Sequence, residues 1–388
     1  SCCRWFVNML RIWLSSGEQL AAVPVGEVRD VRSLKQHLHS ICGLPRFRQR
    51  LLGEGRSLED EFELECSLDL QLVLLQFDTS PDHAHQLAHQ LQHAARHNFP
   101  SQVEELLSRP QDPDVTGTMG ESALYVASER GHLQVVSLLL EAGASKNVIC
   151  GRWTRLTPLG VASREGHTEI VRLLLEAGGT ATDRRDREAS PLYLASLRGH
   201  VEVVRLLLEA GADKDEAFVF TYFQCDPDQL VCSEVTSIQS PLGVASREGH
   251  TEIVRLLLVA GADRERGAGR HDETPLYLAS EHGHVQIARL LIVAGAAKDR
   301  SSGPWGKTPI RIACSKGHVE IVRLLLWAGV TLDDCSHADV SSSAEEDEIK
   351  HLLSEAKEAH IRYNDFTLRR KVRDMTGPPI PATRSALA

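Results

Sequence analysis

Histidine is the residue type in this chain whose spacing could do chemistry, because an imidazole can bind a metal or transfer a proton near neutral pH. Six histidines each follow a glycine, at His132, His167, His200, His250, His284 and His318. Four more recur every four residues, at His85, His89, His93 and His97. On a helix this second spacing places neighbouring imidazoles on one face, where two of them can chelate a metal.

Neither set predicts a catalytic or metal centre. The Gly-His histidines are separated by 35, 33, 50, 34 and 34 residues, which indicates one structural contact per repeated unit. His93 and His97 map to outward positions of an opening helix, and no Cys or carboxylate joins them; zinc chelation by this set is the alternative interpretation. The chain has no HExxH, GxSxG or P-loop pattern, so we expect no enzyme activity, no cofactor and no metal.

The elements that carry these histidines are internal repeats. The segment PLGVASREGHTEIVRLLL occurs twice without a difference, at Pro158–Leu175 and Pro241–Leu258. In its first copy Thr157 supplies a helix N-cap, and Pro158 is suited to the first helical position. Gly166 turns the chain into a second helix that is apolar on most of its circumference. Neighbouring units must therefore cover that helix on both sides.

The pattern TPLxxAxxxGHxxIVxLLLxxGA resembles the ankyrin repeat. It recurs from Ser122, Thr157, Ser190, Ser240, Thr274 and Thr308, and a degenerate opening copy fits Leu91–Thr116. The resemblance implies about seven ankyrin repeats over residues 84–335, in a mainly α solenoid of helix-turn-helix plus hairpin units. It also implies that a protein target binds the concave groove formed by the first helices and the hairpins.

One departure from the ankyrin pattern follows the TPL motif. The usual histidine is replaced by Tyr125, Gly160, Tyr193, Gly243, Tyr277 and Arg311. Tyrosine and glycine alternate through four units, so a pair of repeats was duplicated. Because the resemblance places this position in the groove, Tyr193 and Tyr277 are candidate target-binding residues.

The expected hairpin tips are cationic in a chain of net charge −10. The residues that stand out there are Trp153, Arg155, Arg184, Arg187, Arg266 and Trp305. Trp and Arg dominate binding hot spots, so we predict that this face binds an acidic or extended segment of a protein. The alternative is that the charged tips are merely solvated.

An insertion of about 17 residues interrupts one unit at residues 216–237. Its alternating pattern, broken by Asp226-Pro227-Asp228, predicts an elongated hairpin. Four aromatic residues fall within six positions, at Phe218, Phe220, Tyr222 and Phe223. We expect them either to contact the target or to fold back on the adjacent repeat.

Residues 9–78 predict a separate small α+β domain with the order β-β-α-β-β. Asp30 begins a helix with Val31, Leu34, Leu38 and Ile41 on one face. This order, with GLPRFRQRLLGEGRSLED at residues 43–60 and LQLVL at residues 70–74, resembles the ubiquitin-like (β-grasp) fold. The resemblance implies an exposed partner-binding patch at Leu52, Gln71 and Val73; the alternative is that they are ordinary sheet residues. No Gly-Gly follows Phe77, so a conjugable tag is not expected.

The remaining segments frame these two parts. Residues 1–8 read as an N-terminal extension, residues 336–362 as a C-terminal capping helix, and residues 363–388 as a basic disordered tail. The LRRKVR run at residues 368–373 is alternatively a nuclear-import patch. Nine scattered cysteines favour a reducing, cytoplasmic compartment.

Charge and composition leave two functions. The acidic net charge of −10 argues against nucleic-acid binding, and no run of 18 apolar residues predicts a membrane span. The first function is a non-enzymatic scaffold that binds a protein target through the ankyrin concave face. The second is an adaptor that links this target to ubiquitin or proteasome machinery through the ubiquitin-like domain.

Overall fold

The chain divides into two compact units, Ser1–Ala162 with Glu169–Gly179, and Ser163–Thr168 with Thr180–Ala388. The computed structural model describes residues 9–76, 81–109, 112–117, 119–151, 155–181, 189–225, 232–269, 271–303, 306–330 and 344–362. In the described residues no helix is both long enough and apolar enough to span a membrane.

The first unit begins with a mixed five-stranded sheet. Its strands are β1 (Met9–Leu14), β2 (Gln19–Pro24), β3 (Gln49–Gly53), β4 (Arg56–Ser57) and β5 (Asp69–Leu74), in the order β2-β1-β5-β3-β4. β1 is parallel to β5, and the other neighbours are antiparallel. Because side chains alternate across a strand, one face of the sheet buries Leu10, Ile12, Leu51, Leu70 and Leu72.

Helix α1 (Val31–Cys42) covers this apolar face. The Asp30 carboxylate accepts a hydrogen bond from the Ser33 backbone N–H at 2.7 Å, which caps the helix. Val31, Leu34 and Leu38 on the predicted face are buried, whereas Ile41 is 45% exposed. At 100° per residue Ile41 lies at the margin of the apolar stripe, in the last turn. Two 3-10 turns, η1 (Val25–Glu27) and η2 (Arg46–Arg48), flank this helix along the chain.

Pairs of short helices make up most of the remaining chain. The first unit continues with α2 (Pro81–Arg96), α3 (Pro100–Leu107), α4 (Ala123–Arg130) and α5 (Leu133–Glu141); α6 (Pro158–Glu165) and α7 (Thr168–Glu176) lie where the chain passes between the units. The second unit holds α8 (Pro191–Arg198), α9 (Val201–Glu209), α10 (Pro241–Glu248), α11 (Thr251–Val259), α12 (Pro275–Glu281), α13 (Val285–Val293), α14 (Pro309–Lys316) and α15 (Val319–Trp327).

Local chemistry sets the limits of each pair, as the α8–α9 pair shows. The Ser190 hydroxyl accepts a hydrogen bond from the Tyr193 backbone N–H at 3.2 Å, and Pro191 occupies the first helical position. Gly199 ends α8 in the left-handed conformation at φ 81°, which a residue with a side chain adopts only under strain. The second helix then starts at Val201, directly after His200.

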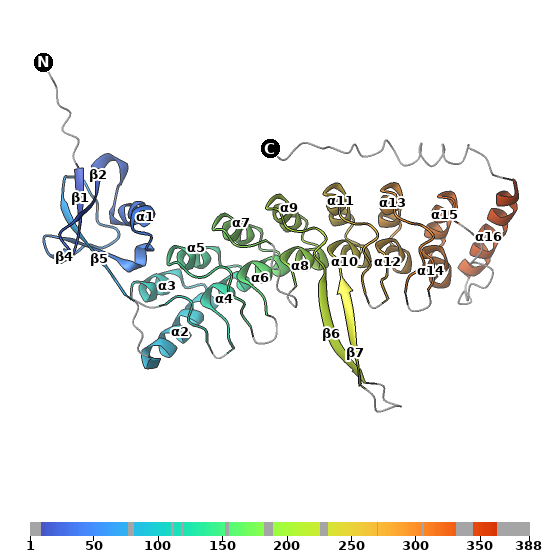
Figure 1. Cartoon of the computed structure of the whole chain (residues 1–388), viewed down its shortest axis with the longest axis horizontal. Coiled ribbons are helices and arrows are strands. Elements are labelled where there is room, and N and C mark those ends of the chain that lie inside the picture. Colours follow the sequence, from blue (N-terminus) through green and yellow to red (C-terminus); the bar gives the residue numbers. More distant parts are fainter. Residues whose placement is uncertain are drawn as a thin grey trace, which may run out of the picture. The chain divides into compact units, whose positions relative to one another are not determined.

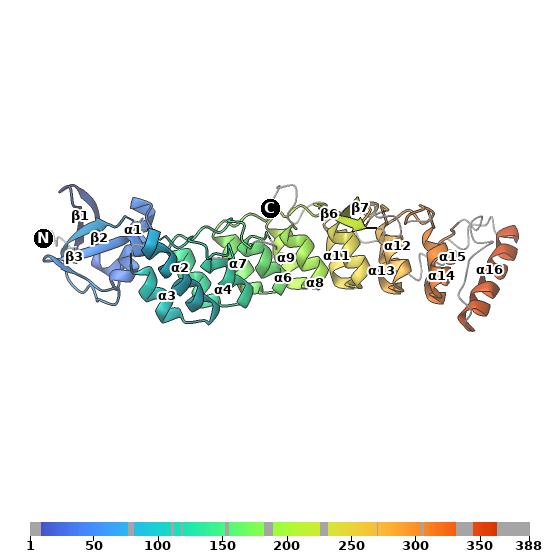
Figure 2. The same ribbon diagram turned by 90° about the horizontal axis from the view of Figure 1, so that it is seen from below.

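The second unit has two layers of helices. α8, α10, α12 and α14 form one row, which we call the first-helix row, and α9, α11, α13 and α15 form the second-helix row (Figure 1). Seen from below, the helix pairs of this unit follow one another in chain order (Figure 2). Each second helix is buried on one side, as Ile253, Val254 and Leu257 show with 0% exposure.

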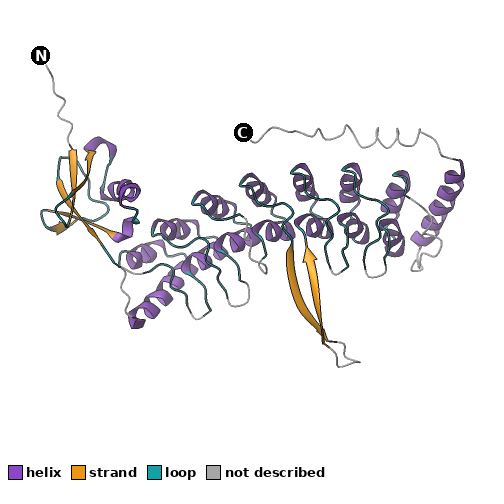
Figure 3. Cartoon of the chain, in the orientation of Figure 1, coloured by secondary structure: helices purple, strands orange, loops and turns teal. Residues whose placement is uncertain are grey.

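Two further elements belong to the second unit. Strands β6 (Phe218–Cys225) and β7 (Cys232–Gln239) form an antiparallel hairpin between α9 and α10, with Phe218 opposite Gln239 and Cys225 opposite Cys232 (Figure 3). Helix α16 (Ala344–Arg362) packs on α15 and buries Ile349 and Leu353.

Candidate interaction surfaces

The Gly-His histidines join successive helix pairs. His200 Nε2–H donates to the Arg164 carbonyl at 2.9 Å, and the same bond recurs from His132, His250, His284 and His318 to Arg96, Leu197, Arg247 and Glu281. A Cβ at Gly249 would lie 2.7 Å from Cε1 of His284, so the glycine makes room for the next imidazole. These imidazoles therefore hold the stack together.

His93 and His97 of α2 pack against each other and against Phe99. The rings of His93 and His97 lie with their centroids 4.5 Å apart, and His97 also stacks on Phe99 at 6.0 Å. His89 is exposed on the same helix, and the side chain of His85 lies outside the described residues. Among the described residues no group of three His, Cys, Asp or Glu side chains could hold a metal ion.

Tyr193 and Tyr277 lie in the interior of the second unit. Their side chains are 6% and 3% exposed, which leaves little area for a target. The Tyr193 ring packs against Phe218 with centroids 5.3 Å apart, so these two residues join α8 to the base of the β6–β7 hairpin. Tyr277 packs under the next loop, because a Cβ at Gly303 would meet its hydroxyl at 2.6 Å. Burial raises the pKa of Tyr277 to about 12.

Glycine alternates with tyrosine at the position after the TPL motif, and at Gly243 the described neighbours give a steric reason for the glycine. A Cβ at Gly243 would lie 2.5 Å from the Cβ of Ala268, in the loop of the following unit. Tyrosine at this position would require that loop to move. Tyrosine and glycine therefore reflect two ways of packing the next loop onto a first helix.

The cationic loop residues differ in how far they are committed to internal contacts. Arg300 bonds to Asp272 at 2.5 Å and to the Glu265 carbonyl at 2.9 Å, so it ties together the loops of two units. Arg266 is exposed, and Arg155 is exposed with a left-handed backbone at φ 45°. The other candidates, namely Trp153, Arg184, Arg187, Trp305 and the side chains of Phe220, Tyr222 and Phe223, lie outside the described residues.

The three predicted patch residues of the N-terminal sheet share one face. Leu52 pairs with Gln71, and Val73 pairs with Arg50, on the face opposite the buried leucines. Leu52 and Val73 are half-buried, and Gln71 is exposed. Leu52 and Gln71 line a shallow hollow of about 320 Å³ together with Trp13.

Trp13 was missed by sequence reasoning. It is half-buried on β1, pairs with Gln71 across the parallel ladder, and donates its Nε1–H to Asp69 at 3.4 Å. The sequence signal that could have identified Trp13 was its position on the outward side of a strand in which buried and outward residues alternate. Its neighbours on β5 follow more than fifty residues later, and the parallel pairing brings them together.

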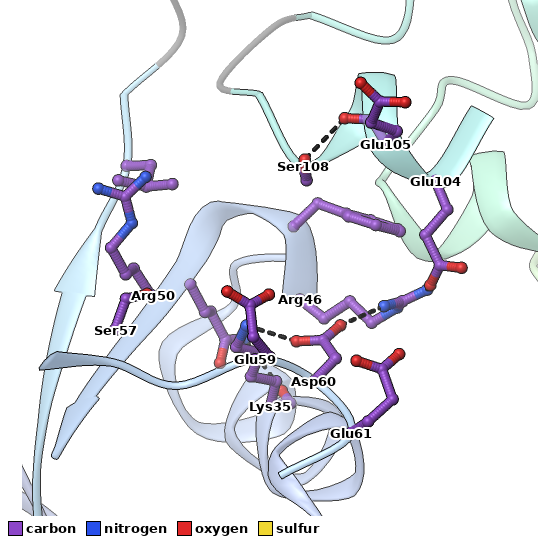
Figure 4. A pocket seen from close by; sticks show the side chains of 13 residues that line it. Lys35, Arg46, Arg50, Ser57, Glu59, Asp60, Glu61, Glu104, Glu105 and Ser108 are labelled. Atoms are coloured by element: carbon purple, nitrogen blue, oxygen red, sulfur yellow. Dashed lines mark hydrogen bonds and ion pairs between the residues drawn. The ribbon is translucent and has the colours of Figure 1, made fainter. Parts of the chain in front are cut away.

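Among the described residues of the first unit, Arg46 makes three ion pairs, and sequence reasoning did not single it out. Its side chain is 2% exposed, and its guanidinium bonds to Asp60 at 2.6 Å, to Glu141 at 2.6 Å and to Glu104 at 3.0 Å. Figure 4 shows Arg46 between Asp60 and Glu104. The guanidinium carbon also lies 3.9 Å from the centroid of the Phe47 ring. Glu104 is on α3 and Glu141 on α5, so Arg46 joins the sheet module to the first helix pairs.

Further contacts support this junction. Arg32 bonds to Glu104 at 3.0 Å, and Lys35 bonds to Asp60 at 2.6 Å. Burial opposes the Arg46 charge, but the hydrogen bonds that Arg46 donates to Glu104 and Glu141 outweigh this effect and raise the pKa of Arg46. A hollow of about 320 Å³ lies beside these ion pairs, with a mostly charged lining (Figure 4).

A comparison with protein-family models agrees with the helical pairs. A family model described as ankyrin repeats (three copies) matches residues 91–186, 150–218, 216–302 and 242–334. The crystal structure of the human ASB11 ankyrin repeat domain is 27% identical, with a TM-score of 0.49, and the match covers 60% of this chain and 96% of that one. A comparison with curated protein sequences found no match.

Proposed function

Since the chain belongs to the ankyrin-repeat family, whose repeats are protein-interaction modules, we propose that it is a non-enzymatic scaffold whose first-helix row and loops bind a protein target. One observation carries this proposal: in the second unit the β6–β7 hairpin projects from the first-helix row (Figure 1). An extended target segment can therefore contact both the β6–β7 hairpin and the first-helix row beside it.

The hairpin is held at its base and carries exposed apolar area. Tyr193 packs on Phe218, and Ile238 exchanges two backbone hydrogen bonds with Gly269, at 3.2 Å and 2.5 Å. Val219 and Ile238 pair across the strands and are 37% and 45% exposed. This pair supports a contact role for the hairpin, because its base is ordered while its surface is apolar.

The chemistry of the loops favours an acidic or extended target segment. Arg266 is exposed, and Arg155, Arg184 and Arg187 add positive charge along the loop sequences. Trp153 and Trp305 occupy equivalent positions in different units and supply hot-spot residues.

The test is a pull-down from cell extract with the full chain and two double variants, quantified by mass spectrometry. Trp153→Ala with Trp305→Ala, and Val219→Asp with Ile238→Asp, should each lose the same set of proteins. Arg205→Ala, on the outer side of α9, is the matched control and should retain them. Equal recovery by all four proteins would rule out the first-helix side as the target surface.

The sheet face of the N-terminal module favours a second candidate function. We propose that this module resembles ubiquitin-like domains closely enough to dock on ubiquitin or proteasome machinery and so acts as an adaptor for the bound target. The grouping of Trp13, Leu52 and Gln71 around one hollow supports this function.

The adaptor is tested by Leu52→Asp and Val73→Asp, which should abolish co-purification with ubiquitin or proteasome components. Phe62→Asp is a suitable control, because Phe62 is 45% exposed and does not line that hollow. If the patch variants still recover these components, or if wild type recovers none, the scaffold function stands alone.

A further inference from the structure

The last three second helices end on an exposed apolar residue. From α5 onward, each second helix ends directly before an Ala-Gly dipeptide, so the last residue of each second helix can be compared between repeats. This residue is Glu141, Glu176 and Glu209 in three pairs, and Val259, Val293 and Trp327 in the last three. We call Val259, Val293 and Trp327 the outer stripe; their exposures are 59%, 37% and 45%.

The outer stripe is continuous across neighbouring helices. α13 contacts both α11 and α15, so the three residues lie about 8–10 Å apart, the usual distance between packed helices. A single exposed apolar residue is ordinary, but three at equivalent positions of adjacent helices form one apolar strip.

An arginine lies one helical turn before each residue of the outer stripe, at Arg255, Arg289 and Arg323. Arg255 bonds to Glu252 at 3.4 Å, and Arg323 bonds to Glu320 at 3.9 Å. At the corresponding position before Arg289 the chain has Gln286, and within the described residues no ion pair is recorded for Arg289, which is exposed. The central arginine therefore keeps its charge for a partner carboxylate.

The chain itself shows which chemistry fits this surface. Helix α16 begins with an acidic turn and is amphipathic; its Ile349 and Leu353 are buried, and its Glu348 bonds to Arg323 at 2.8 Å. α16 thus already covers the end of the row as an acidic amphipathic helix. At α5 the residue equivalent to the outer stripe, Glu141, holds Arg46 of the sheet module, so this helix position also serves for docking there.

We propose that the outer stripe binds an acidic amphipathic helix of a partner protein, laid across α11, α13 and α15. Seven residues of an α-helix advance roughly 10.5 Å, which matches the distance between the underlying helices, so one apolar residue in seven would meet each member of the stripe. A carboxylate beside the central apolar residue bonds Arg289. Trp327 and Arg289 are of the residue types that dominate such interfaces.

Charge argues against two other occupants. The basic LRRKVR run of residues 368–373 would bring like charges to Arg255, Arg289 and Arg323. If a second copy of the chain docked through the same surface, its Arg255, Arg289 and Arg323 would face the same three arginines of the first copy, and the like charges would repel. The surface also differs from the one proposed for the main target, since it belongs to the second-helix row.

The experiment uses the full chain and a labelled synthetic peptide of 24 residues, with leucines at heptad spacing and glutamates on both flanks. Fluorescence anisotropy should show saturable binding, and a peptide with lysine in place of every glutamate should bind roughly tenfold more weakly or worse. Val293→Glu and Trp327→Ala should each weaken the acidic peptide by about tenfold or more. Arg289→Glu should reverse the preference and bind the lysine peptide better.

Arg205→Glu is the matched control, because Arg205 occupies the same position on α9, outside the outer stripe; it should leave binding unchanged. The Trp153→Ala, Trp305→Ala protein should also bind the peptide normally, which separates this site from the proposed groove. The proposal is overturned if the acidic peptide does not bind, or if Arg289→Glu leaves the charge preference unaltered. It is also overturned if Val293→Glu dissociates a dimer seen by sedimentation, or if peptide binding requires removal of residues 363–388.

Discussion

Arg46 illustrates how much of this chain's organisation depends on one side chain. Three carboxylates contact its guanidinium, and they come from the loop after β4 and from two separate helices. The planar guanidinium has donors along several directions and can serve all three, whereas a lysine ammonium on a flexible stem cannot reproduce that fork.

We predict that Arg46→Met destabilises the first unit by about 3 kcal/mol, because it removes the buried guanidinium and leaves three half-buried carboxylates without their counter-charge. Arg46→Lys should restore less than half of this loss. Urea unfolding followed by circular dichroism measures the change, with Arg50→Met as the control since Arg50 is exposed on the same module. A loss for Arg46→Met no larger than for Arg50→Met would mean that the bonds contribute nothing to stability.

Tyr277 gives a residue-scale prediction about pH. Burial raises its pKa from the ordinary value of 10.0 to about 12, so the unfolded chain releases this proton at lower pH than the folded protein. The associated stability is present in full below pH 10.0 and is lost as pH rises through about 12. Between pH 9 and 12, wild type should therefore lose more unfolding free energy than Tyr277→Phe; parallel profiles would contradict the shift.

At the scale of the element, the two identical 18-residue segments are followed by loops of different sequence. Each contains a glycine at the same place in its first helix, Gly160 in one copy and Gly243 in the other. The nearest described side-chain atom to a Cβ at Gly160 is 3.4 Å away, whereas a Cβ at Gly243 would meet Ala268 at 2.5 Å. The loop of residues 182–188 after the first copy lies outside the described residues, so the close contact is established for Gly243.

We predict that Gly243→Ala destabilises the second unit by about 1–3 kcal/mol, because the added methyl overlaps the loop of the next unit. Gly160→Ala is the matched control; it should be neutral or gain up to about 1 kcal/mol, since alanine favours a helix over glycine. Thermal unfolding of both variants tests this. The double variant Gly243→Ala with Ala268→Gly should recover much of the loss, and failure to recover would point to another cause.

At the scale of the whole molecule, each helix pair depends on its neighbours. The second helices are apolar on more than one side, so a terminal pair needs a cover with a polar outer surface. α16 supplies that cover for α15 by burying Ile349 and Leu353, and its ion pair from Glu348 to Arg323 adds a polar contact at the edge.

We predict that deleting residues 344–388 destabilises the last pair by about 3 kcal/mol, the transfer free energy of two buried aliphatic side chains. Deleting residues 363–388 alone should leave stability unchanged and serves as the control. Hydrogen exchange should rise in α14 and α15 and stay constant in α8 and α9, because stability in a repeat array is local. Uniform protection after the longer deletion would show that α16 is not a cap.

The helix pairs, their turns and four of the five strands of the N-terminal module were predictable from sequence, because caps, glycine turns and alternating apolar residues act within a few positions. The two-residue strand β4 was not predicted, because it is too short to show an alternating pattern. Which residues form the candidate surfaces was harder to predict from the sequence. Tyr193 and Tyr277 were expected in the groove and are buried, and Trp13 was overlooked beside Leu52 and Gln71. Burial of a large side chain depends on the neighbouring unit, which a local pattern does not specify.

Local sequence was therefore sufficient for the repeats, since a helix and its ends depend on residues three or four positions apart. The three-dimensional arrangement was needed for Arg46, whose carboxylate partners lie 14, 58 and 95 positions away. It was also needed for the outer stripe, whose members are visible in the sequence but become one surface when α11, α13 and α15 pack side by side. Contacts between distant segments follow from how whole elements pack, and this packing gives one repeated sequence different surfaces in different units.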